Sequence, residues 1–227
     1  MRAKDVMTTS VVTIGPQAEI PEVARVLLEH RISAVPIVDK TGSILGLVSE
    51  GDLMRRAECG SHRSWWLSLL ADKTNIYERD RGTRAKDVMT RAVVSIDPET
   101  TISDIARILE SNGIKRVPVI QNGKLVGIVS RADVLRGLAV IGLSPDHSVS
   151  IPDREIRERI CDEIRRQTSA SLSAVSIIVV DGAVYLWGIA DTQADRDAIR
   201  IAAENVAGVN KVHDFLNTLP DVLSGIK

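Results

Sequence analysis

The chain has 227 residues, of which 44% are hydrophobic and 26% charged, and its formal net charge is −1. This composition suits a globular protein of one large domain or two small ones, and the balanced charge provides no basic field for nucleic acid. Aromatic residues make up only 3%, so the stacking platforms of single-strand binders are not expected either.

The cellular compartment is predicted from the cysteines and from the missing signal sequence. Cys59 and Cys161 lie in separate segments, which favours a reducing compartment over a disulfide scaffold. The N-terminus carries Asp5 and no sustained apolar run, unlike a secretory signal. The longest apolar stretch, at 134–143, is interrupted by Arg136 and is too short to span a bilayer. We expect a cytoplasmic protein.

An internal repeat organises the first two-thirds of the chain. The pentapeptide KDVMT occurs at residues 4–8 and again at 86–90, an offset of 82 positions. The offset falls to 81 at the last matching segments, because the turn at 121–123 is one residue shorter than the turn at 39–42. The other matching pairs are VVTI at 11–14 with VVSI at 93–96, AVPIV at 34–38 with RVPVI at 116–120, and GLVSEGD at 46–52 with GIVSRAD at 127–133.

Each repeat is predicted to be a β-α-β-β-α unit. In the first helix the apolar residues Ile20, Val23, Val26 and Leu27 recur at helical spacing. One such unit has too little apolar surface to close a core alone, so we expect the two to pack together as a pseudo-twofold pair. The predicted elements are extended segments at 11–14 and 93–96, helices at 19–30 and 101–112, strands at 34–38, 44–48, 116–120 and 124–129, and helices from 52 and 133.

Residues 57–85 join the repeats. Trp65, Trp66, Leu69 and Leu70 would form one apolar face of a helix. We expect this face to pack over the sheet or against a partner subunit, because a membrane-surface helix would carry more lysine and arginine opposite the tryptophans.

The C-terminal third begins after a linker at 142–152. Asp153 is expected to cap a helix at 154–167, in which Ile156, Ile160 and Ile164 form one apolar stripe. Two strands at 174–180 and 183–189 follow, joined by Asp181-Gly182, the signature of a type I′ hairpin turn. A helix at 192–206 with a C-cap at Gly208 and a strand at 210–219 complete an α-β-β-α-β order.

The two Ser-x-x-Asp steps are the candidate functional residues. Ser49 with Asp52, and Ser130 with Asp133, have the spacing of a capping box, which satisfies the amides at a helix start. The same aspartate has suitable geometry to accept hydrogen bonds from a ribose diol, and the helix N-terminus favours phosphate. Both interpretations remain open at this point.

No catalytic or metal-binding pattern is found. There is no phosphate-binding glycine-lysine loop and no nucleophile elbow. The histidines are far apart and are expected to be surface or helix-end residues; they are His30, His62, His147 and His213. The chain is therefore expected to be non-enzymatic, with no required cofactor.

Two family resemblances cover most of the chain. The duplicated KDVMT, x-V-P-h-V and G-h-V-S-x-x-D motifs resemble a pair of CBS domains, a Bateman module, over residues 1–141. The domains would be 1–56 and 86–141, separated by the joining segment. Residues 153–220 resemble a BON domain, so the implied fold is α/β (α+β). The residues that carry this second resemblance are Asp181, Gly182, Val184, Leu186, Gly188, Ala203, Val206, Gly208, Val209 and Val212.

The CBS resemblance implies two adenine-nucleotide clefts, each drawing on both repeats. One would combine Ser130, Arg131 and Asp133 with Lys4, Thr9, Ile32, Ser33 and Ala34. The other would combine Ser49, Glu50 and Asp52 with Lys86, Arg91, Ile114, Lys115 and Arg116. Because Glu50 repels phosphate and Arg131 attracts it, we expect tighter binding at Asp133. Lys115 and Arg116 would oppose this difference by giving the Asp52 cleft a positive wall.

The resulting hypothesis is a regulatory protein that senses an adenine nucleotide such as AMP, ADP or ATP. The resemblance also implies a homodimer, with the BON domain relaying the nucleotide state to a partner. The alternative is a scaffold protein with empty CBS clefts, whose BON domain docks on phospholipid or an envelope component.

Overall fold

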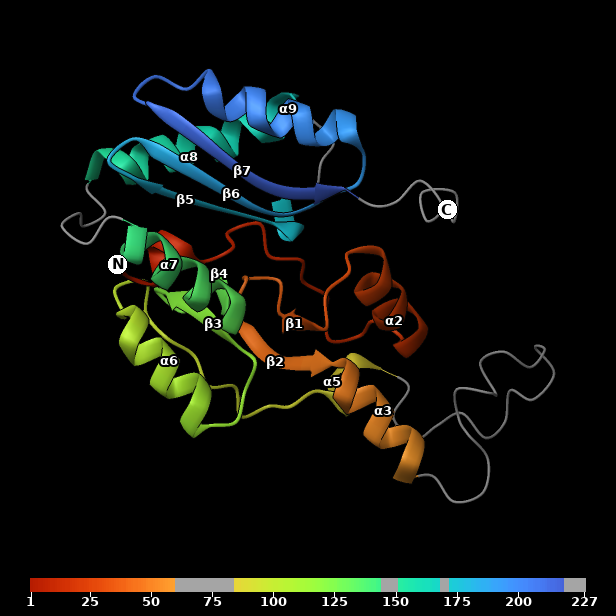
Figure 1. Cartoon of the computed structure of the whole chain (residues 1–227). Helices are drawn as coiled ribbons and strands as arrows, with labels where there is room; N and C mark the ends of the chain where they lie inside the picture. The colour runs from red at the N-terminus through yellow and green to blue at the C-terminus, as the bar shows by residue number, and fades with distance from the viewer. Residues whose placement is uncertain (60–83, 144–150, 168–171, 219–227) are drawn as a thin grey trace. The chain divides into compact units, whose positions relative to one another are not determined.

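The structure is a computed structural model that describes residues 1–59, 84–143, 151–167 and 172–218 (Figure 1). The predicted tryptophan-bearing helix of the joining segment and most of the linker at 142–152 lie outside the described residues. Within the described ranges, no helix combines the length and apolar character needed to cross a bilayer. The mixed α and β content confirms the predicted fold class.

The chain divides into two compact units whose limits do not follow the repeat boundaries. One unit comprises Val12–Val94 with Asn122–Leu125. The other comprises Met1–Val11, Ser95–Gln121 and Val126–Lys227. The first eleven residues thus belong to the unit that contains most of the second repeat and the C-terminal domain.

The unit of the first repeat is built on an antiparallel hairpin. Strand β1 (Ala34–Val38) pairs with β2 (Ile44–Ser49), and Ala34 lies opposite Ser49. Helix α2 (Ile20–Glu29) precedes this hairpin, and α3 (Glu50–Cys59) follows it directly. The residues predicted to face inward in α2 are buried or half-buried. The core residues are Ile14, Ile20, Val23, Leu27, Val35, Ile37, Val48, Leu53 and Ala85.

The second repeat has the same local order. Helix α6 (Ile102–Ser111) precedes the two-stranded sheet of β3 (Arg116–Gln121) and β4 (Lys124–Ser130). Helix α7 (Arg131–Leu143) follows β4. The extended segments predicted before α2 and α6 form single parallel bridges, Ile14 to Ile37 and Ile96 to Val119, rather than regular strands.

The KDVMT copies lie in two lead-in segments, and each folds against the repeat that it does not precede. The first lead-in, residues 2–10, contains helix α1 (Ala3–Val6), and Thr8 exchanges two main-chain hydrogen bonds of 3.0 Å with Ile128 of β4. The second lead-in, residues 84–92, contains α5 (Ala85–Val88), and Thr90 pairs in the same way with Leu47 of β2.

Glycines in β2 and β4 make room for the lead-in methionines. A Cβ atom at Gly127 would lie within 3 Å of the Met7 side chain, and a Cβ atom at Gly46 would lie equally close to Met89. The glycine of each G-h-V-S-x-x-D motif is therefore a packing requirement, because the methionine of the duplicated KDVMT occupies the space above it.

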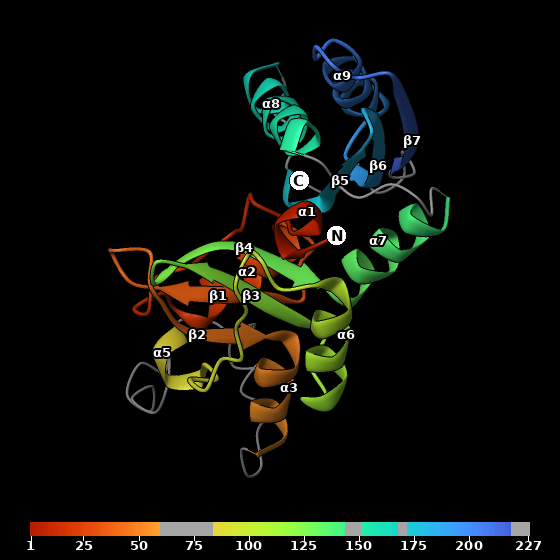
Figure 2. The same cartoon turned by 90° about the vertical axis from the view of Figure 1, so that its left-hand side faces the viewer.

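The C-terminal domain is a three-stranded sheet covered on one face by two helices. Strand β5 (Val175–Val180) pairs antiparallel with β6 (Ala183–Ala190), which pairs parallel with β7 (Lys211–Thr218). Helices α8 (Ile151–Gln167) and α9 (Gln193–Glu204) lie on the same side of this sheet (Figure 2). The short helix η1 (Leu172–Ala174) leads into β5. The core between them includes Ile156, Ile160, Ile164, Ile177, Val179, Val184, Leu186, Ile199, Ala202, Ala203 and Leu216.

The hairpin turn of this domain follows the prediction, but two helix limits do not. Asp181 and Gly182 both have positive φ angles, of 50° and 72°, as a type I′ turn requires. Helix α8 begins before Asp153, so the predicted cap at that residue is wrong. Asp153 is 2% exposed and instead accepts a 2.8 Å hydrogen bond from the amide of Gly182, which anchors the turn.

The predicted C-cap of the second helix is also wrong. Helix α9 ends at Glu204, and Asn205 is its C-cap. Gly208 lies beyond the helix with a φ angle of 97°, and a Cβ atom there would lie within 3 Å of Ile156. Close packing against α8 therefore explains this glycine.

Candidate functional site

The Ser-x-x-Asp step at the start of α7 forms a complete capping box. One carboxylate oxygen of Asp133, Oδ2, accepts hydrogen bonds from the amide of Ser130 at 2.8 Å and from its hydroxyl at 2.7 Å. The Ser130 hydroxyl in turn accepts a 3.3 Å bond from the amide of Asp133. The capping interpretation of the sequence is confirmed at this helix.

The first repeat reproduces this geometry at the start of α3. Asp52 Oδ2 accepts hydrogen bonds from the Ser49 amide at 2.8 Å and from its hydroxyl at 2.6 Å, and the Asp52 amide donates to the hydroxyl at 3.2 Å. The local backbone therefore does not distinguish the two copies.

A capping box alone does not identify a binding site in this protein. The Thr101 hydroxyl donates to Asp104 and accepts from the Asp104 amide at the start of α6, and Thr192 and Asp195 form the same reciprocal pair at the start of α9. Asp104 and Asp195 are both half-buried, whereas Asp133 is 4% exposed. Any binding function must therefore depend on the groups that surround the box.

The second oxygen of Asp133 is partly engaged. Arg136, one turn along α7, donates to Asp133 Oδ1 at 2.8 Å. A carboxylate oxygen has two lone pairs, so Oδ1 retains one acceptor position in this arrangement. Sequence reasoning missed Arg136, although its i+3 spacing from Asp133 on a helix is a usable signal.

Residues at the start of β3 lie beside the Asp133 box. The amide of Arg131 donates to the carbonyl of Lys115 at 3.1 Å, and the Arg131 guanidinium Nε donates to the carbonyl of Ile114 at 3.1 Å. Arg116 follows directly as the first residue of β3. The exposed cations Arg131 and Lys115 are thus brought together at the N-terminus of α7.

The corresponding residues of the first repeat lie beside the Asp52 box. The amide of Glu50 donates to the carbonyl of Ser33 at 3.0 Å, and Ala34 is paired with Ser49. Ile32 precedes them in the chain. The Asp52 box therefore has Glu50 where the Asp133 box has Arg131, and Ser33 where the Asp133 box has Lys115.

These contacts bear on the predicted grouping of the site residues. The sequence interpretation placed Ile32–Ala34 with Asp133, and Ile114–Arg116 with Asp52. The structure pairs each set with the box of its own repeat, because antiparallel pairing of a hairpin puts the start of its first strand beside the end of its second. Lys115 and Arg116 consequently lie at the start of β3 beside the Asp133 box, and the composition of each ligand cleft stays a prediction.

The predicted lead-in residues lie with the expected repeats. Lys4 and the half-buried Thr9 belong to the lead-in that is bonded to β4, which ends at Ser130. Lys86 and Arg91 belong to the lead-in that is bonded to β2, and Arg91 donates to the carbonyl of Lys86 at 3.0 Å. The exchange of lead-ins between repeats is therefore as the resemblance implied.

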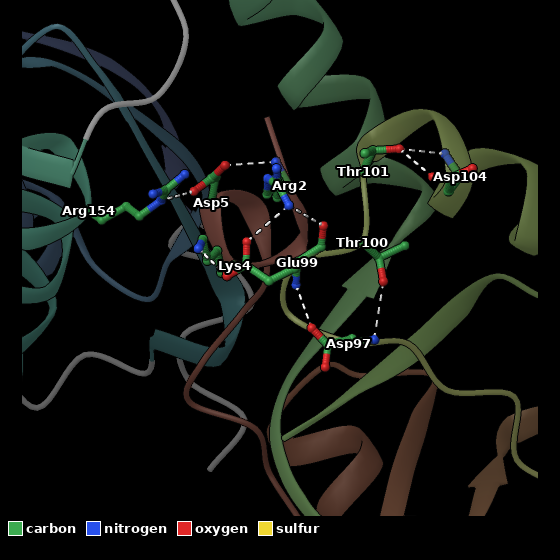
Figure 3. A network of polar contacts seen from close by, with 9 residues as sticks. All are labelled: Arg2, Lys4, Asp5, Asp97, Glu99, Thr100, Thr101, Asp104 and Arg154. Carbon is green, nitrogen blue, oxygen red and sulfur yellow. Dashed lines mark hydrogen bonds and ion pairs between the residues drawn. The ribbon is translucent and has the colours of Figure 1, made fainter. Parts of the chain in front are cut away.

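Lys4 already has an anionic partner. Its ammonium group forms an ion pair with Glu99, which also lies 3.1 Å from the guanidinium of Arg2 (Figure 3). The hydrogen bond from Lys4, followed by the charges of Lys4 and Arg2, holds the pKa of Glu99 below its ordinary value. A ligand phosphate near Lys4 would compete with this carboxylate.

The described histidines take no part in either box. His30 is the C-cap of α2, as expected of a helix-end residue. His213 is half-buried on β7 and lies between the rings of Tyr185 and Phe215, with centroid distances of 4.7 and 6.3 Å. His62 and His147 lie outside the described residues. The described ranges contain no group of three or more side chains suited to a metal ion.

Comparisons with known families agree with this arrangement. Residues 3–58 and 85–140 each match the CBS domain family, and residues 152–220 match the BON domain family. The CBS domain-containing protein YhcV of Bacillus subtilis is 29% identical over 131 residues, which are 58% of this chain and 81% of YhcV. CBSX1, a chloroplastic CBS domain-containing protein of Arabidopsis thaliana, is 31% identical over 60% of this chain and 62% of CBSX1.

One solved structure of similar fold contains a nucleotide. The crystal structure of CBSX2 in complex with AMP matches with a TM-score of 0.50 and 26% sequence identity, over 62% of this chain and 98% of CBSX2. No catalytic family is among these matches.

Proposed function

Because this chain belongs to the CBS-domain proteins and carries a BON domain behind its CBS pair, we propose that it is a non-enzymatic regulatory protein that binds an adenine nucleotide. The observation that carries the proposal is the clustering of Arg131 and Lys115 beside the Asp133 capping box at the N-terminus of α7. The AMP bound by CBSX2 supports the choice of ligand class.

The proposed binding mode follows from the atoms available. The remaining acceptor position on Asp133 Oδ1 would take one ribose hydroxyl, and a shift of Arg136 would open a second. The phosphate would lie at the start of α7, where the helix dipole favours an anion. Arg131 and Lys115 would add charge-assisted contacts to the phosphate oxygens. Lys4 and Thr9 would contact the nucleotide from the first lead-in.

The Asp52 site would bind the same ligand less well. Glu50 stands where Arg131 stands in the other copy, and Ser33 stands where Lys115 stands. A carboxylate near the helix N-terminus repels a phosphate that the other site attracts. The protein would therefore have one strong and one weak site.

Isothermal titration of the full chain with AMP, ADP and ATP tests the proposal. We expect binding in the wild type, strong loss with Asp133→Ala and a smaller loss with Asp52→Ala. Asp104→Ala is the control, because Asp104 exchanges hydrogen bonds with the N-cap hydroxyl of α6 as Asp133 does in α7. If none of the three nucleotides binds the folded wild-type protein, the proposed function is wrong.

The protein would act as a cytoplasmic homodimer that passes the nucleotide state to a partner through its BON domain. Dimer formation is expected from the CBS family. Sedimentation equilibrium with and without AMP would measure it, and a monomer under both conditions would contradict this part of the proposal.

An aromatic row on the BON sheet supports a second function, docking on a phospholipid surface. Trp187 stacks on Phe215 with a centroid distance of 5.2 Å, Tyr185 stacks on His213, and Phe215 is 47% exposed. Such rings suit a membrane interface, where one edge is apolar and the other hydrated. Co-sedimentation of the full chain with phosphatidylglycerol vesicles should be lost with Phe215→Ser, and equal pelleting of both proteins would contradict this function.

A further inference from the structure

Helix α8 carries a stripe of arginines beside its buried isoleucine stripe. Arg154, Arg157 and Arg165 are spaced three and eight residues apart, which places them on one face of the helix. All three side chains make contacts with the first lead-in. We call these three residues the arginine clasp.

The central arginine of the clasp is buried. Arg157 is 8% exposed, and its Nε donates to the carbonyl of Ile177 in β5 at 2.7 Å. Its two terminal nitrogens donate to the carbonyls of Lys4, at 3.3 Å, and of Met7. A buried guanidinium is strongly destabilising unless it is hydrogen-bonded, so this position requires the carbonyls of the lead-in in their present places.

The outer members hold the two ends of the same segment. Arg154 Nε donates to Asp5 at 2.7 Å, and Asp5 is 1% exposed and also accepts from the amide of Arg2 (Figure 3). Arg165 donates to the hydroxyl of Ser10 at 3.0 Å. The clasp therefore contacts the first lead-in along its length, from residue 4 to residue 10.

The opposite side of the lead-in is bonded to the second repeat. The amides of Ala3 and Lys4 donate to the carbonyls of Thr100 and Pro98, and Thr8 pairs with Ile128. Strand β5 also lies against α1 and α7. The lead-in is thus held between the BON domain and the strand that ends in the Asp133 box.

We infer that the arginine clasp orders the first lead-in for nucleotide binding, so that BON docking and nucleotide affinity at the Asp133 site increase together. The inference rests on the proposed function, because Lys4 and Thr9 are proposed contacts to the nucleotide. A site whose walls are already ordered loses less conformational entropy on binding. By thermodynamic reciprocity, a nucleotide that favours the ordered lead-in also favours the docked BON domain.

The test uses Arg157→Met in the full chain, which removes the hydrogen bonds but keeps an unbranched side chain. We expect the Kd for AMP at the Asp133 site to rise about five- to tenfold, at the lower end of typical coupling strengths. Arg159→Met is the matched control, because Arg159 lies on the same helix in an exposed ion pair with Glu155. The control is expected to leave the Kd unchanged.

Hydrogen exchange supplies a second readout of the same coupling. AMP should slow amide exchange in both α1 and α8 of the wild type, and in α1 alone of Arg157→Met. If Arg157→Met does not fold, Arg165→Gln replaces it, since Arg165 is 46% exposed, its partner Asp162 is exposed, and its contact with Ser10 is lost without leaving a buried charge.

The outcomes separate the inference from the proposed function. If AMP binds the wild type, and the clasp variant binds it equally or more tightly, the inference is wrong and the proposed function stands. The inference would also be wrong if AMP slowed amide exchange in α1 of the wild type but not in α8. If the folded wild type binds no adenine nucleotide, the proposed function fails, and the coupling fails with it.

Discussion

The two lead-ins share the sequence AKDVMT but have different surroundings. Asp5 in the first is 1% exposed and forms an ion pair with Arg154, whereas its counterpart Asp87 in the second is exposed. Both aspartates accept a hydrogen bond from the amide three residues earlier. The repeat therefore preserves the local structure, and the C-terminal domain makes the copies unequal.

The inner contacts of the lead-ins remain alike. Met7 and Met89 each lie over a glycine of the neighbouring strand, and Thr8 and Thr90 form equivalent main-chain pairs. Two differences remain within the described residues: α8 contacts only the first lead-in, and Glu99 beside the first lead-in is replaced by Gln17 beside the second. Duplication has therefore kept the CBS core the same in both copies, while the BON domain at the C-terminal end of the chain introduces the asymmetry.

Replacing Asp5 and Asp87 should produce the largest difference in stability between the two lead-ins. Asp5→Asn removes the partner of Arg154 from a buried position and is expected to destabilise the protein by about 2 kcal/mol, less than a fully buried pair because Arg154 is partly exposed. Asp87→Asn should cost at most about 1 kcal/mol, the value of an exposed cap. Urea unfolding measures the stability of both variants. Equal losses of unfolding free energy would show that the surroundings of Asp5 and Asp87 do not differ in energy.

Replacing the two strand glycines should have equal effects. Gly127→Ala and Gly46→Ala each force a methionine to move, at a cost of about 1–3 kcal/mol for an overpacked site. The paired variant Gly127→Ala with Met7→Ala serves as the control, because it should lose less than the sum of its single changes. Clearly unequal losses of stability in Gly46→Ala and Gly127→Ala would show that the asymmetry extends to the contacts between the lead-ins and the strands.

Exchanging the charges beside the capping boxes should alter nucleotide affinity. Arg131→Glu is expected to raise the Kd for AMP at the Asp133 site about thirtyfold, since unit charges ~4 Å apart in water interact by ~1 kcal/mol and the reversal replaces an attraction by a repulsion of that size. Glu50→Arg should lower the Kd at the Asp52 site by a similar factor. Titration calorimetry at two salt concentrations checks both, because the effect should shrink as salt rises. Unchanged affinities in both variants would show that these charges do not set the difference between the sites.

The smallest expected effect concerns Glu99, the ion-pair partner of Lys4, and the pH dependence of stability. Lys4 lowers the pKa of Glu99, so Glu99 adds stability above its ordinary pKa of 4.5 and loses that contribution as the pH falls through its lowered pKa. The equivalent residue near the second lead-in is Gln17, which accepts a hydrogen bond from Arg84. Glu99→Gln should therefore flatten the fall in stability below pH 4.5, as measured by urea midpoints.

Gln17→Glu is the reciprocal variant. It should steepen the same acid-side fall by creating a carboxylate beside Arg84. If neither substitution changes the pH dependence of the urea midpoint, Glu99 does not contribute through its ionisation.

Much of the local structure was predictable because its causes are short-range. The Asp181-Gly182 turn, the isoleucine stripe of α8 and both Ser-x-x-Asp boxes depend on residues within a few positions of one another. The repeat itself indicated that two equivalent sites exist, and the family resemblance indicated that the lead-ins exchange between them.

The errors arose where distant segments meet. Asp153 was taken for a helix cap, but it binds the amide of Gly182, a contact that no local pattern encodes. The main-chain contact of Lys115 with Arg131 was likewise not among the predicted groupings. That contact could have been deduced from the predicted turn at Asn122-Gly123.

The clasp could not have been identified from the sequence. Arg154, Arg157 and Arg165 lie among other charged residues of α8, and their spacing alone indicates only a common face. Arg159 and Arg166, in the same helix, pair with carboxylates on α8 itself. Which arginines reach the lead-in depends on the docking of α8.

The sequence by itself determined two repeats, their secondary structure, the capping boxes, and the difference between Glu50 and Arg131. These features follow from hydrogen bonds and side-chain periodicity over a few residues. Only the tertiary structure decided that Lys115 lies beside Asp133 and that Asp5 is buried while Asp87 is exposed. Burial and long-range pairing depend on which surfaces meet, and identical lead-in sequences meet different surfaces in this protein.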